Sequence, residues 1–213
     1  MSALTETLTA VAAAVVAASD DLNRLDGAAG DGDLGITMSV AAQAALDAMA
    51  EGGTDAAEDL LRRIGLAIAR RAPSTAGTLV ATALLAASRI EPAEELPVAA
   101  IARRVRAGFT AIGDRGHAKV GDKSMLDALS PVVASLERDA TSGTPLADAL
   151  EHAAAAARDG SLATQSLTPR VGRAGWLAER SLGNEDAGAH MVAVVFNSIA
   201  ASVVGRGPDT AAG

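Results

Sequence analysis

The sequence predicts an all-α protein in which seven or eight antiparallel helices form an up-and-down bundle, or a bundle closed into an eight-helix barrel. Three observations support this fold class. Apolar residues recur at helical spacing along most of the chain, and convincing strand alternation is absent. Glycine- and proline-containing stretches separate these segments as short loops would. Aromatic residues make up only 1% of the sequence, which favours many closely packed helices over a core with aromatic anchors.

Four helices are predicted in the first half of the chain. Residues Glu51-Gly52-Gly53 end the second helix, Thr54 is a candidate cap for the third, and Pro73 ends the third. Proline residues then mark the turn that follows the fourth helix. The predicted helices cover residues 2–24, 36–49, 54–72 and 76–90.

Four more helices are predicted in the second half. The stretch 141–145, Thr-Ser-Gly-Thr-Pro, separates two of them, and residues 159–188 form the least regular part of the chain. We expect a single domain over residues 1–205 and a flexible tail over 206–213. The predicted helices cover residues 98–109, 125–136, 146–158 and 189–204.

The charge and composition exclude several functional classes. The formal net charge is −8, and Lys119 and Lys123 are the only lysines, whereas nucleic-acid backbones are bound by clustered Lys and Arg. The absence of cysteine excludes disulfides, thiolate nucleophiles and thiolate-bound zinc. The longest apolar run near the start, residues 10–18, is too short to span a bilayer. We therefore expect a cytoplasmic protein with neither nucleic acid nor a membrane as partner.

The segment from Asp26 to Gly35 is acidic and rich in glycine. It places Asp26, Asp31 and Asp33 within eight residues, and glycine gives the backbone the freedom to bring their carboxylates to one point. Oxygen ligands favour Mg²⁺ or Ca²⁺, but the spacing does not match a calcium-binding EF-hand. Two interpretations stay open: a metal site, or an aspartate, Asp31 or Asp33, that only caps the following helix.

Glycine-bearing loops recur at 26–35, 72–78, 113–124 and 172–188 and alternate with the helices. Three of them open onto a helix N terminus, where free N–H groups favour anions such as phosphate. If the loops meet at one end, a Mg²⁺ ion on the carboxylates could bridge to nucleotide phosphates. The chain lacks the Gly-x-x-x-x-Gly-Lys-Ser/Thr sequence and a strand before any loop, which excludes a conventional P-loop.

Three segments follow one another along nearly the whole chain: Leu25–Met38 (LDGAAGDGDLGITM), Arg115–Asp127 (RGHAKVGDKSMLD) and Gly172–Gly188 (GRAGWLAERSLGNEDAG). Together they are similar to the nucleotide-binding L subunit of dihydroxyacetone kinase. This resemblance implies an antiparallel eight-helix barrel that binds ADP or ATP through two Mg²⁺ ions at one rim.

Position by position, the resemblance implies that Asp26, Asp31 and Asp33 bind the Mg²⁺ ions and carry the catalytic function. Taken singly, Met125 is equally explained as a core residue, Arg173 as a surface ion-pair partner and Asp186 as a turn former. The implied nucleotide contacts are Leu34, Gly35, Ile36, Thr37, Thr75, Ala76, Gly77, Gly116, Met125, Arg173, Glu185, Asp186 and Ala187.

The chain departs from that family in the implied phosphate contacts but not in the aspartates. Thr37 replaces a usual Asn, and Leu34 stands where His is common. The family's Gly-Gly-x-Ser-Gly loop aligns with residues 73–77, so Ala76 replaces a serine and a hydroxyl donor to phosphate is lost. The candidate substitutes are Ser74, Thr75 and Thr78.

The resemblance also implies a division of labour. In that family a histidine of a separate K subunit binds dihydroxyacetone. We therefore expect a phosphotransfer subunit of a kinase for dihydroxyacetone or a related ketose or triose, active only with that partner. The phosphate source, either ATP or a phosphocarrier protein that regenerates bound ADP, stays open, as does a homodimer.

Two alternative functions also stay open. The domain could be the ATP-binding module of a fatty-acid-kinase-like system, with the acyl acceptor on another domain. It could instead be a non-catalytic helical protein whose small-residue core encloses an apolar ligand such as a lipid. Loss of the phosphate-loop serine favours this last alternative, whereas retention of all three aspartates argues against it.

Overall fold

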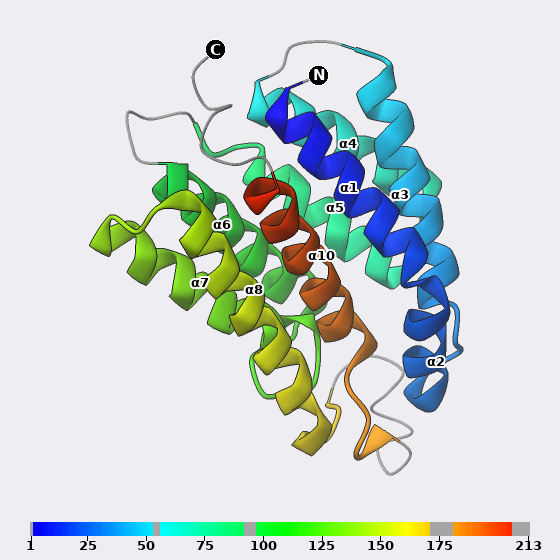
Figure 1. The fold of residues 1–213 in the computed structure, drawn as a ribbon. Helices are drawn as coiled ribbons and strands as arrows, with labels where there is room; N and C mark the ends of the chain where they lie inside the picture. Colours follow the sequence, from blue (N-terminus) through cyan, green and yellow to red (C-terminus); the bar gives the residue numbers. More distant parts are fainter. Residues whose placement is uncertain (1, 53–55, 92–96, 171–180, 206–213) are drawn as a thin grey trace.

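The computed structural model describes residues 2–52, 56–91, 97–170 and 181–205, and every regular element in these ranges is helical (Figure 1). The predicted all-α fold is therefore confirmed. The elements are α1 (Ala3–Ala17), α2 (Ser19–Ala29), α3 (Leu34–Ala50), α4 (Ala57–Arg71), α5 (Thr75–Ala87), α6 (Pro97–Gly116), α7 (Met125–Ser142), α8 (Leu146–Ala163), the 3₁₀ turn η1 (Thr164–Ser166) and α10 (Ala187–Val204).

Eight of these helices form a closed ring. Each packs against the next in the order α1, α3, α4, α5, α6, α7, α8 and α10, and α10 returns to pack against α1. Neighbours in the ring run in opposite directions (Figure 1). Helix α2 packs against α3 and α10 at one end. The bundle therefore closes into a barrel, the second of the two architectures that the sequence predicts.

Several helix boundaries differ from the predicted ones. The predicted helix 2–24 is two helices, α1 and α2, bent by 54° where they meet. Because α2 continues to Ala29, Asp26 lies in its last turn and not in a loop. Helix α6 continues through Gly113 to Gly116, where a loop was expected, because packing in the barrel outweighs the weak helix propensity of glycine. The predicted cap Thr54 and the predicted tail lie outside the described residues.

Small residues bring the helices of the barrel close together. On α8, Ala149, Ala153 and Ala157 are fully buried. On the same helix, a Cβ atom added to Gly160 would lie 2.7 Å from the carbonyl oxygen of Asp127 on α7. A larger residue there would force the two helices apart. The many small residues of the sequence therefore allow the close helix packing that the composition predicts.

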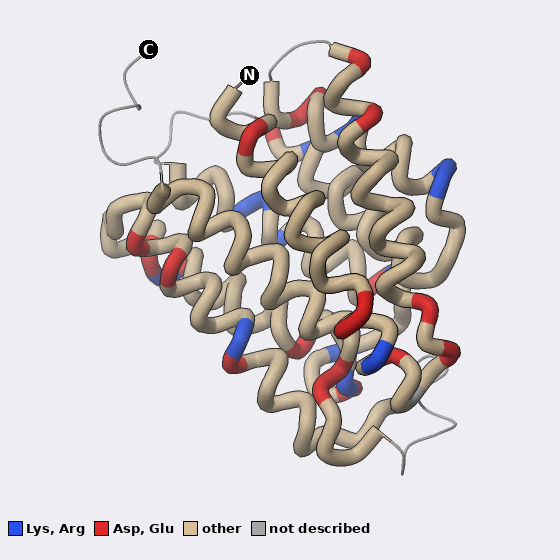
Figure 2. The backbone as a smooth tube through the Cα atoms, turned by 45° about the vertical axis from the view of Figure 1, so that its right-hand side comes forward, with Lys and Arg blue, Asp and Glu red and all other residues tan. Residues whose placement is uncertain are grey.

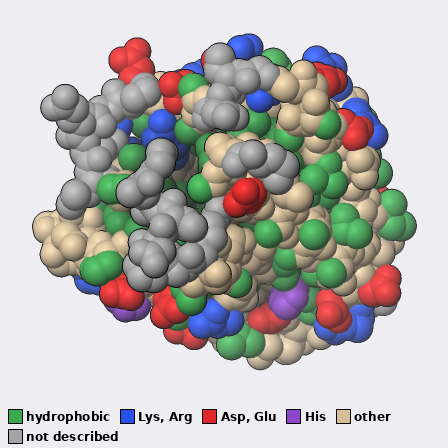
Figure 3. Space-filling view, turned by 45° about the horizontal axis from the view of Figure 1, so that its top comes forward, with side chains coloured by type: hydrophobic (Ala, Val, Ile, Leu, Met, Phe, Trp, Pro, Cys, Tyr) green, Lys and Arg blue, Asp and Glu red, His purple; other side chains and the backbone are tan. Residues whose placement is uncertain are grey.

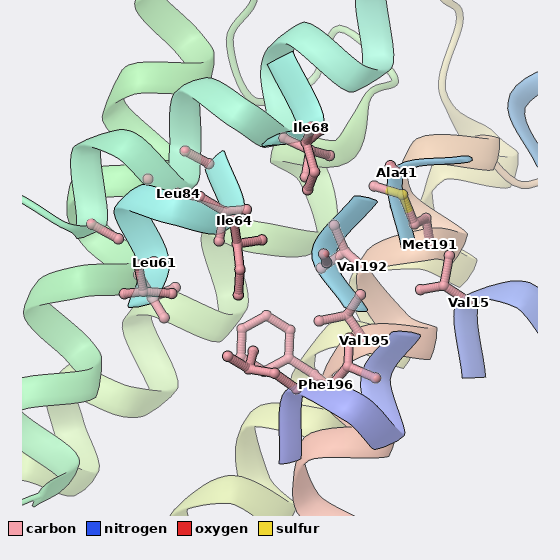
Figure 4. A pocket seen from close by; sticks show the side chains of 18 of the residues that line it. Val15, Ala41, Leu61, Ile64, Ile68, Leu84, Met191, Val192, Val195 and Phe196 are labelled. Atoms are coloured by element: carbon pink, nitrogen blue, oxygen red, sulfur yellow. The ribbon is translucent and has the colours of Figure 1, made fainter. Parts of the chain in front are cut away.

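The barrel encloses an apolar cavity of about 350 Å³. Figure 4 shows side chains from α1, α3, α4, α5 and α10 directed toward it, with Ile64 and the ring of Phe196 facing one another. Arg104 of α6 is the one charged residue among those that line it. The cavity follows from a core with few large side chains.

Helix α10 is long and apolar enough to cross a membrane by length and composition alone, and the bent pair α1 and α2 passes the same criterion. In the barrel α10 packs against α8, α1 and α7, and buries Met191, Val192 and Phe196. Its apolar character is therefore explained by its place in the core.

The antiparallel ring sends every second connection to the same end of the barrel, which we call the rim. The N termini of α3, α5, α7 and α10 lie at the rim, at the lower end in Figure 1. The described parts of the four glycine-bearing loops, which for the last loop are residues 181–188, therefore meet at one end, as expected. All four precede a helix N terminus, one more than the sequence predicted.

A glycine on α3 sets the approach of α2 to α3 beside the rim. A Cβ atom added to Gly35 would lie 2.0 Å from the backbone oxygen of Ser19, which cannot move independently of its helix. We expect Gly35→Ala to lower the free energy of unfolding by more than about 2 kcal/mol in urea titrations.

The matched control is Gly27→Ala on α2, where the nearest atom to an added Cβ is the Cα of Gly32 at 3.8 Å. This substitution should leave stability unchanged or raise it by up to about 1 kcal/mol, since alanine is the better helix former. Equal losses in both variants would contradict the role assigned to Gly35.

Candidate functional site

The rim connections surround a cavity of about 650 Å³, a size typical of small-molecule sites. Its wall combines the α2–α3 connection, the start of α5, the α6–α7 loop and the start of α10. Acidic and basic residues occur together among these connections at the lower end of the tube in Figure 2. On the face shown in Figure 3, Lys and Arg side chains are scattered among acidic and hydrophobic ones without forming a continuous basic patch.

The structure brings the three predicted aspartates together. One carboxylate oxygen of each of Asp26, Asp31 and Asp33 lies within 4.8 Å of the others. Asp31 and Asp33 are exposed, and Asp26 is partly buried. Among the described residues this is the one group of three or more acidic, His or Cys side chains that close together. Oxygen atoms at this spacing can surround a single divalent cation.

Asp26 organises the connection between α2 and α3. Its Oδ2 atom accepts hydrogen bonds from the N–H of Gly32 at 2.9 Å and of Asp33 at 3.0 Å. Gly32 adopts a φ of +75°, a conformation that favours glycine. Because Asp26 is anchored in helix α2, the chain folds around its carboxylate and returns Asp31 and Asp33 to the same place.

The capping interpretation fails for Asp33. This residue occupies the N-cap position of α3, but its side chain makes no capping hydrogen bond. Instead, the Oδ1 atom of Asn23 on α2 accepts from the N–H of Gly35 at 2.7 Å and of Ile36 at 3.2 Å. The cap of α3 is thus supplied by the preceding helix, and the Asp33 carboxylate is not needed for it.

The start of α5 forms a second part of the wall. Ser74 caps this helix, since its Oγ atom accepts from the N–H of Gly77 at 3.0 Å. Gly77 itself packs against the backbone, because an added Cβ would lie 2.1 Å from the oxygen of Ala72. Of the three hydroxyl residues proposed to replace the missing serine, Ser74 and Thr75 line the cavity, together with Ala76.

The α6–α7 loop, residues 117–124, contains the two non-glycine residues with positive φ in the described chain, His117 at 51° and Lys123 at 60°. Such conformations are disfavoured and often occur at functional sites. Lys123 is only 4% exposed, and its Nζ donates to the carbonyl oxygens of Ser181 at 2.8 Å and Asn184 at 2.9 Å. Burial lowers the pKa of this ammonium group, while the Asp186 carboxylate opposes that shift.

Acidic groups lie at the start of α10. Asp186 caps the helix by accepting from the N–H of Ala189 at 2.7 Å. Burial raises its pKa to about 6, and the nearby Asp127 carboxylate acts in the same direction, whereas the hydrogen bond from Ala189 and the Lys123 charge oppose the rise. The neighbouring Glu185 pairs with Nδ1 of His190 at 2.8 Å.

Most of the residues predicted as nucleotide contacts lie in the wall of this cavity. Gly35, Ile36 and Gly77 do not line it. Ile36 is 61% exposed, and the N–H groups of all three residues already donate to Asn23 or Ser74. Arg173 lies outside the described residues. The predicted residues that line the cavity are Asp26, Asp31, Asp33, Leu34, Thr37, Thr75, Ala76, Gly116, Met125, Glu185, Asp186 and Ala187.

Sequence reasoning assigned no role to several residues of the wall. Lys123 and Ser124 belong to the Arg115–Asp127 segment, but their spacing alone does not indicate burial or a partner 58 residues away. Asn184 also lines the wall. The one available signal was that Lys123 is one of two lysines in the chain and lies in a glycine-bearing loop.

Comparisons with known proteins find relatives over most of the chain. The family model of the DAK2 domain matches residues 28–201. The D-erythrulose kinase of Mycolicibacterium smegmatis is 37% identical over 196 residues, which cover 90% of this chain and 33% of that kinase. The ADP-binding subunit DhaL of the PEP-dependent dihydroxyacetone kinase 1 of Listeria innocua is 29% identical over 178 residues, which cover 84% of each chain.

Solved structures include a similar fold. The dihydroxyacetone kinase of C. freundii in complex with AMP-PNP and Mg²⁺ matches with a TM-score of 0.75 and 27% identity, over 95% of this chain and 34% of that one. This chain therefore spans about a third of the length of the erythrulose kinase and of the solved kinase, but most of the length of the DhaL subunit.

The raised pKa of Asp186 predicts a pH-dependent stability. The folded state binds this proton more tightly than the unfolded state, so the stability that it contributes is complete below about pH 4 and is lost as the pH rises through about 6. Asp186→Asn keeps a capping oxygen but cannot ionise. We expect the variant to gain stability relative to the unmodified protein between pH 4 and 7, by up to about 3 kcal/mol.

Urea unfolding in the presence of a metal chelator, at several pH values, measures this difference. A difference between the two proteins that stays constant from pH 4 to 7 would show that Asp186 does not titrate in this range.

Proposed function

Since the chain belongs to the DAK2 domain family, we propose that it is the nucleotide-binding phosphotransfer component of a ketose kinase. The observation that carries the proposal is the group of three carboxylates within 4.8 Å of one another, at a cavity onto which four helices open with their N termini. Carboxylates bind the cation, and the cation and the helix N termini together bind phosphate. The same cavity is large enough to accept a nucleotide.

The three aspartates are suited to Mg²⁺ by both donor type and spacing. Oxygen atoms that ligate Mg²⁺ lie about 2.1 Å from it, so ligands of one ion lie within about 4.2 Å of one another. The observed limit of 4.8 Å is close to this value and requires only small side-chain adjustments. We propose that Asp26, Asp31 and Asp33 hold two Mg²⁺ ions, which neutralise charge on the phosphates. Asp26 also orders the connection through its hydrogen bonds to Gly32 and Asp33.

The start of α5 is the proposed phosphate contact of the protein itself. Ser74 uses an oxygen lone pair to cap the helix, so its hydroxyl hydrogen and the hydroxyl of Thr75 can donate to a phosphate oxygen. These groups would replace the hydroxyl that is lost at Ala76. Catalysis would then rest on positioning and charge neutralisation, as in other phosphoryl transfers.

Another part of the wall suits the adenine and ribose. Gly116 and Met125 line it together with Ala187 at the start of α10. Met125 packs closely on α10, since a Cβ atom added to Gly188 would lie 3.4 Å from the Cβ of Met125. An apolar wall of this kind can accept the face of a purine base.

The sugar site is proposed to lie outside this chain. The erythrulose kinases, whose names give a ketose as substrate, are about three times as long as the matched region, and the DhaL relatives are subunits. We propose that a K-type subunit or domain holds a ketose such as dihydroxyacetone or erythrulose and supplies the base that activates its hydroxyl. ATP or a phosphocarrier protein would provide the phosphate. These ketose-kinase relatives favour this function over a fatty-acid-kinase module.

The apolar cavity favours a second candidate function. Its volume of about 350 Å³ and its apolar lining could enclose an apolar ligand such as a lipid. Native mass spectrometry of the purified protein distinguishes the candidates. A bound nucleotide supports the kinase component, whereas a bound lipid without nucleotide binding supports the non-catalytic alternative.

The proposed metal site predicts magnesium-dependent nucleotide binding. We expect the protein to bind ADP in isothermal titration calorimetry with millimolar Mg²⁺, and Asp33→Asn to weaken this affinity at least about tenfold, equivalent to about 1.4 kcal/mol. Removing Mg²⁺ should have a similar effect on the unmodified protein, because the phosphates would face uncompensated carboxylates.

The matched control is Asp21→Asn on α2, which removes an exposed carboxylate paired with Arg24 outside the cavity. Its ADP affinity should equal that of the unmodified protein. Equal affinity of all three proteins, with and without Mg²⁺, would overturn the proposed function.

The division of labour predicts that turnover needs a partner. Alone, the chain should bind nucleotide but produce no phosphorylated dihydroxyacetone or erythrulose. Addition of a K-type subunit should restore product formation, measured by mass spectrometry with either ATP or a phosphocarrier protein as donor. Product formation by the isolated chain would contradict the proposed location of the sugar site.

A further inference from the structure

Lys123 is buried at the rim in a conformation that is costly for a lysine. It is 4% exposed, and its φ of 60° lies in the left-handed region, which costs a non-glycine residue about 1 kcal/mol or more. Burial of an ammonium group adds a desolvation cost. Glycine would avoid both costs, so we infer that the lysine makes interactions that glycine cannot make.

The ammonium group joins two parts of the cavity wall that are distant in sequence. Its Nζ donates to the carbonyl oxygens of Ser181 and Asn184, which lie just before α10. Beside it, the carbonyl oxygen of Asp122 accepts from the N–H of Arg170. The α6–α7 loop is therefore tied to the chain that follows η1.

The segment before α10 has a second anchor on its other side. The N–H of Gly183 donates to the carbonyl oxygen of Gln165 at 3.1 Å, and the N–H of Asp186 donates to Oγ1 of Thr164 at 2.8 Å. These bonds attach the segment to η1 at the end of α8. The place of residues 184–187 in the cavity wall is thus set between η1 and Lys123.

The charge of Lys123 also suits its surroundings. Asp186 and Asp127 lie close enough to influence one another, and each raises the energy of the other as an anion. The Asp127 carboxylate accepts from the N–H of Gly121 and of Ser124 and so shapes the same loop. The Lys123 charge stabilises the Asp186 carboxylate and so opposes this repulsion.

We propose that Lys123 is a positioning residue for the nucleotide: by holding Asn184 and Ser181, it preforms the wall around Met125 and Ala187 against which the base and ribose bind. The inference rests on the proposed function. The Nζ atom of Lys123 donates to backbone oxygens at the rim, and Lys123 does not line the apolar cavity of the barrel. Its loss should therefore disturb the nucleotide pocket more than the barrel.

The test compares ligands that differ in the base and ribose. Isothermal titration calorimetry with Mg-ADP and with Mg-pyrophosphate is performed on the full chain and on Lys123→Met. We expect the variant to bind Mg-ADP at least about tenfold more weakly and Mg-pyrophosphate within about twofold of the unmodified protein, since pyrophosphate would use only the Mg²⁺ ions on the aspartates and the start of α5.

Two further variants control for charge and folding. Lys119→Met removes the other lysine, which is exposed in the same loop, and should bind both ligands as the unmodified protein does. Lys123→Arg retains a buried cation with donors and should keep Mg-ADP affinity within about threefold. Circular dichroism and urea unfolding establish that each variant is folded.

The results distinguish failure of the inference about Lys123 from failure of the proposed function. Unchanged Mg-ADP affinity in Lys123→Met, or an equal loss in Lys119→Met, overturns the inference while the proposed function stands. Equal weakening of Mg-ADP and Mg-pyrophosphate also overturns it, because the ammonium would then act on the phosphates. If Lys123→Met does not fold, loss of Mg-ADP binding in a folded Lys123→Arg overturns the positioning role. Failure of the unmodified protein to bind Mg-ADP overturns the proposed function itself.

Discussion

Strict alternation of helix direction around a closed ring is the constraint on which the rest of this structure depends. With eight helices in sequence order, every second connection must lie at the same end, and those connections precede α3, α5, α7 and α10. Four partial positive charges from helix N termini therefore converge on one cavity. These N termini favour anions without a basic patch, but they lie beside the carboxylates of the same rim, which repel anions unless a cation is bound.

Close approach of the helices depends on small residues at particular contacts. Gly35 permits α3 to meet the start of α2, and Gly160 permits α8 to meet α7. These contacts are incompatible with even one additional carbon atom unless the backbone shifts. The same preference for small side chains leaves the apolar cavity inside the barrel. The close packing between helices and the apolar cavity inside the barrel thus have the same cause.

Several acidic groups lie at the rim, and their charges are stabilised in different ways. Asp26 is stabilised by backbone N–H donors of the connection that it organises, and Asp31 and Asp33 are exposed beside it. Asp186 lies at a helix N terminus near the buried Lys123, yet burial still raises its pKa to about 6. The first group is open to a cation from solvent, whereas Asp186 already has a cation within the protein. This difference separates carboxylates that are accessible to a cation from a carboxylate that is held within the wall.

The sequence by itself determined the helical class, the existence of the glycine-bearing loops and the three aspartates, because helical periodicity and turn residues are local signals. It misplaced the start of the acidic loop, since α2 continues past Asp26 to Ala29. Only the tertiary structure decided that Asn23 caps α3 and that Lys123 holds residues 58 and 61 positions away. These contacts form only when the helices pack into the ring, and a local sequence pattern does not specify which distant residue a side chain will contact.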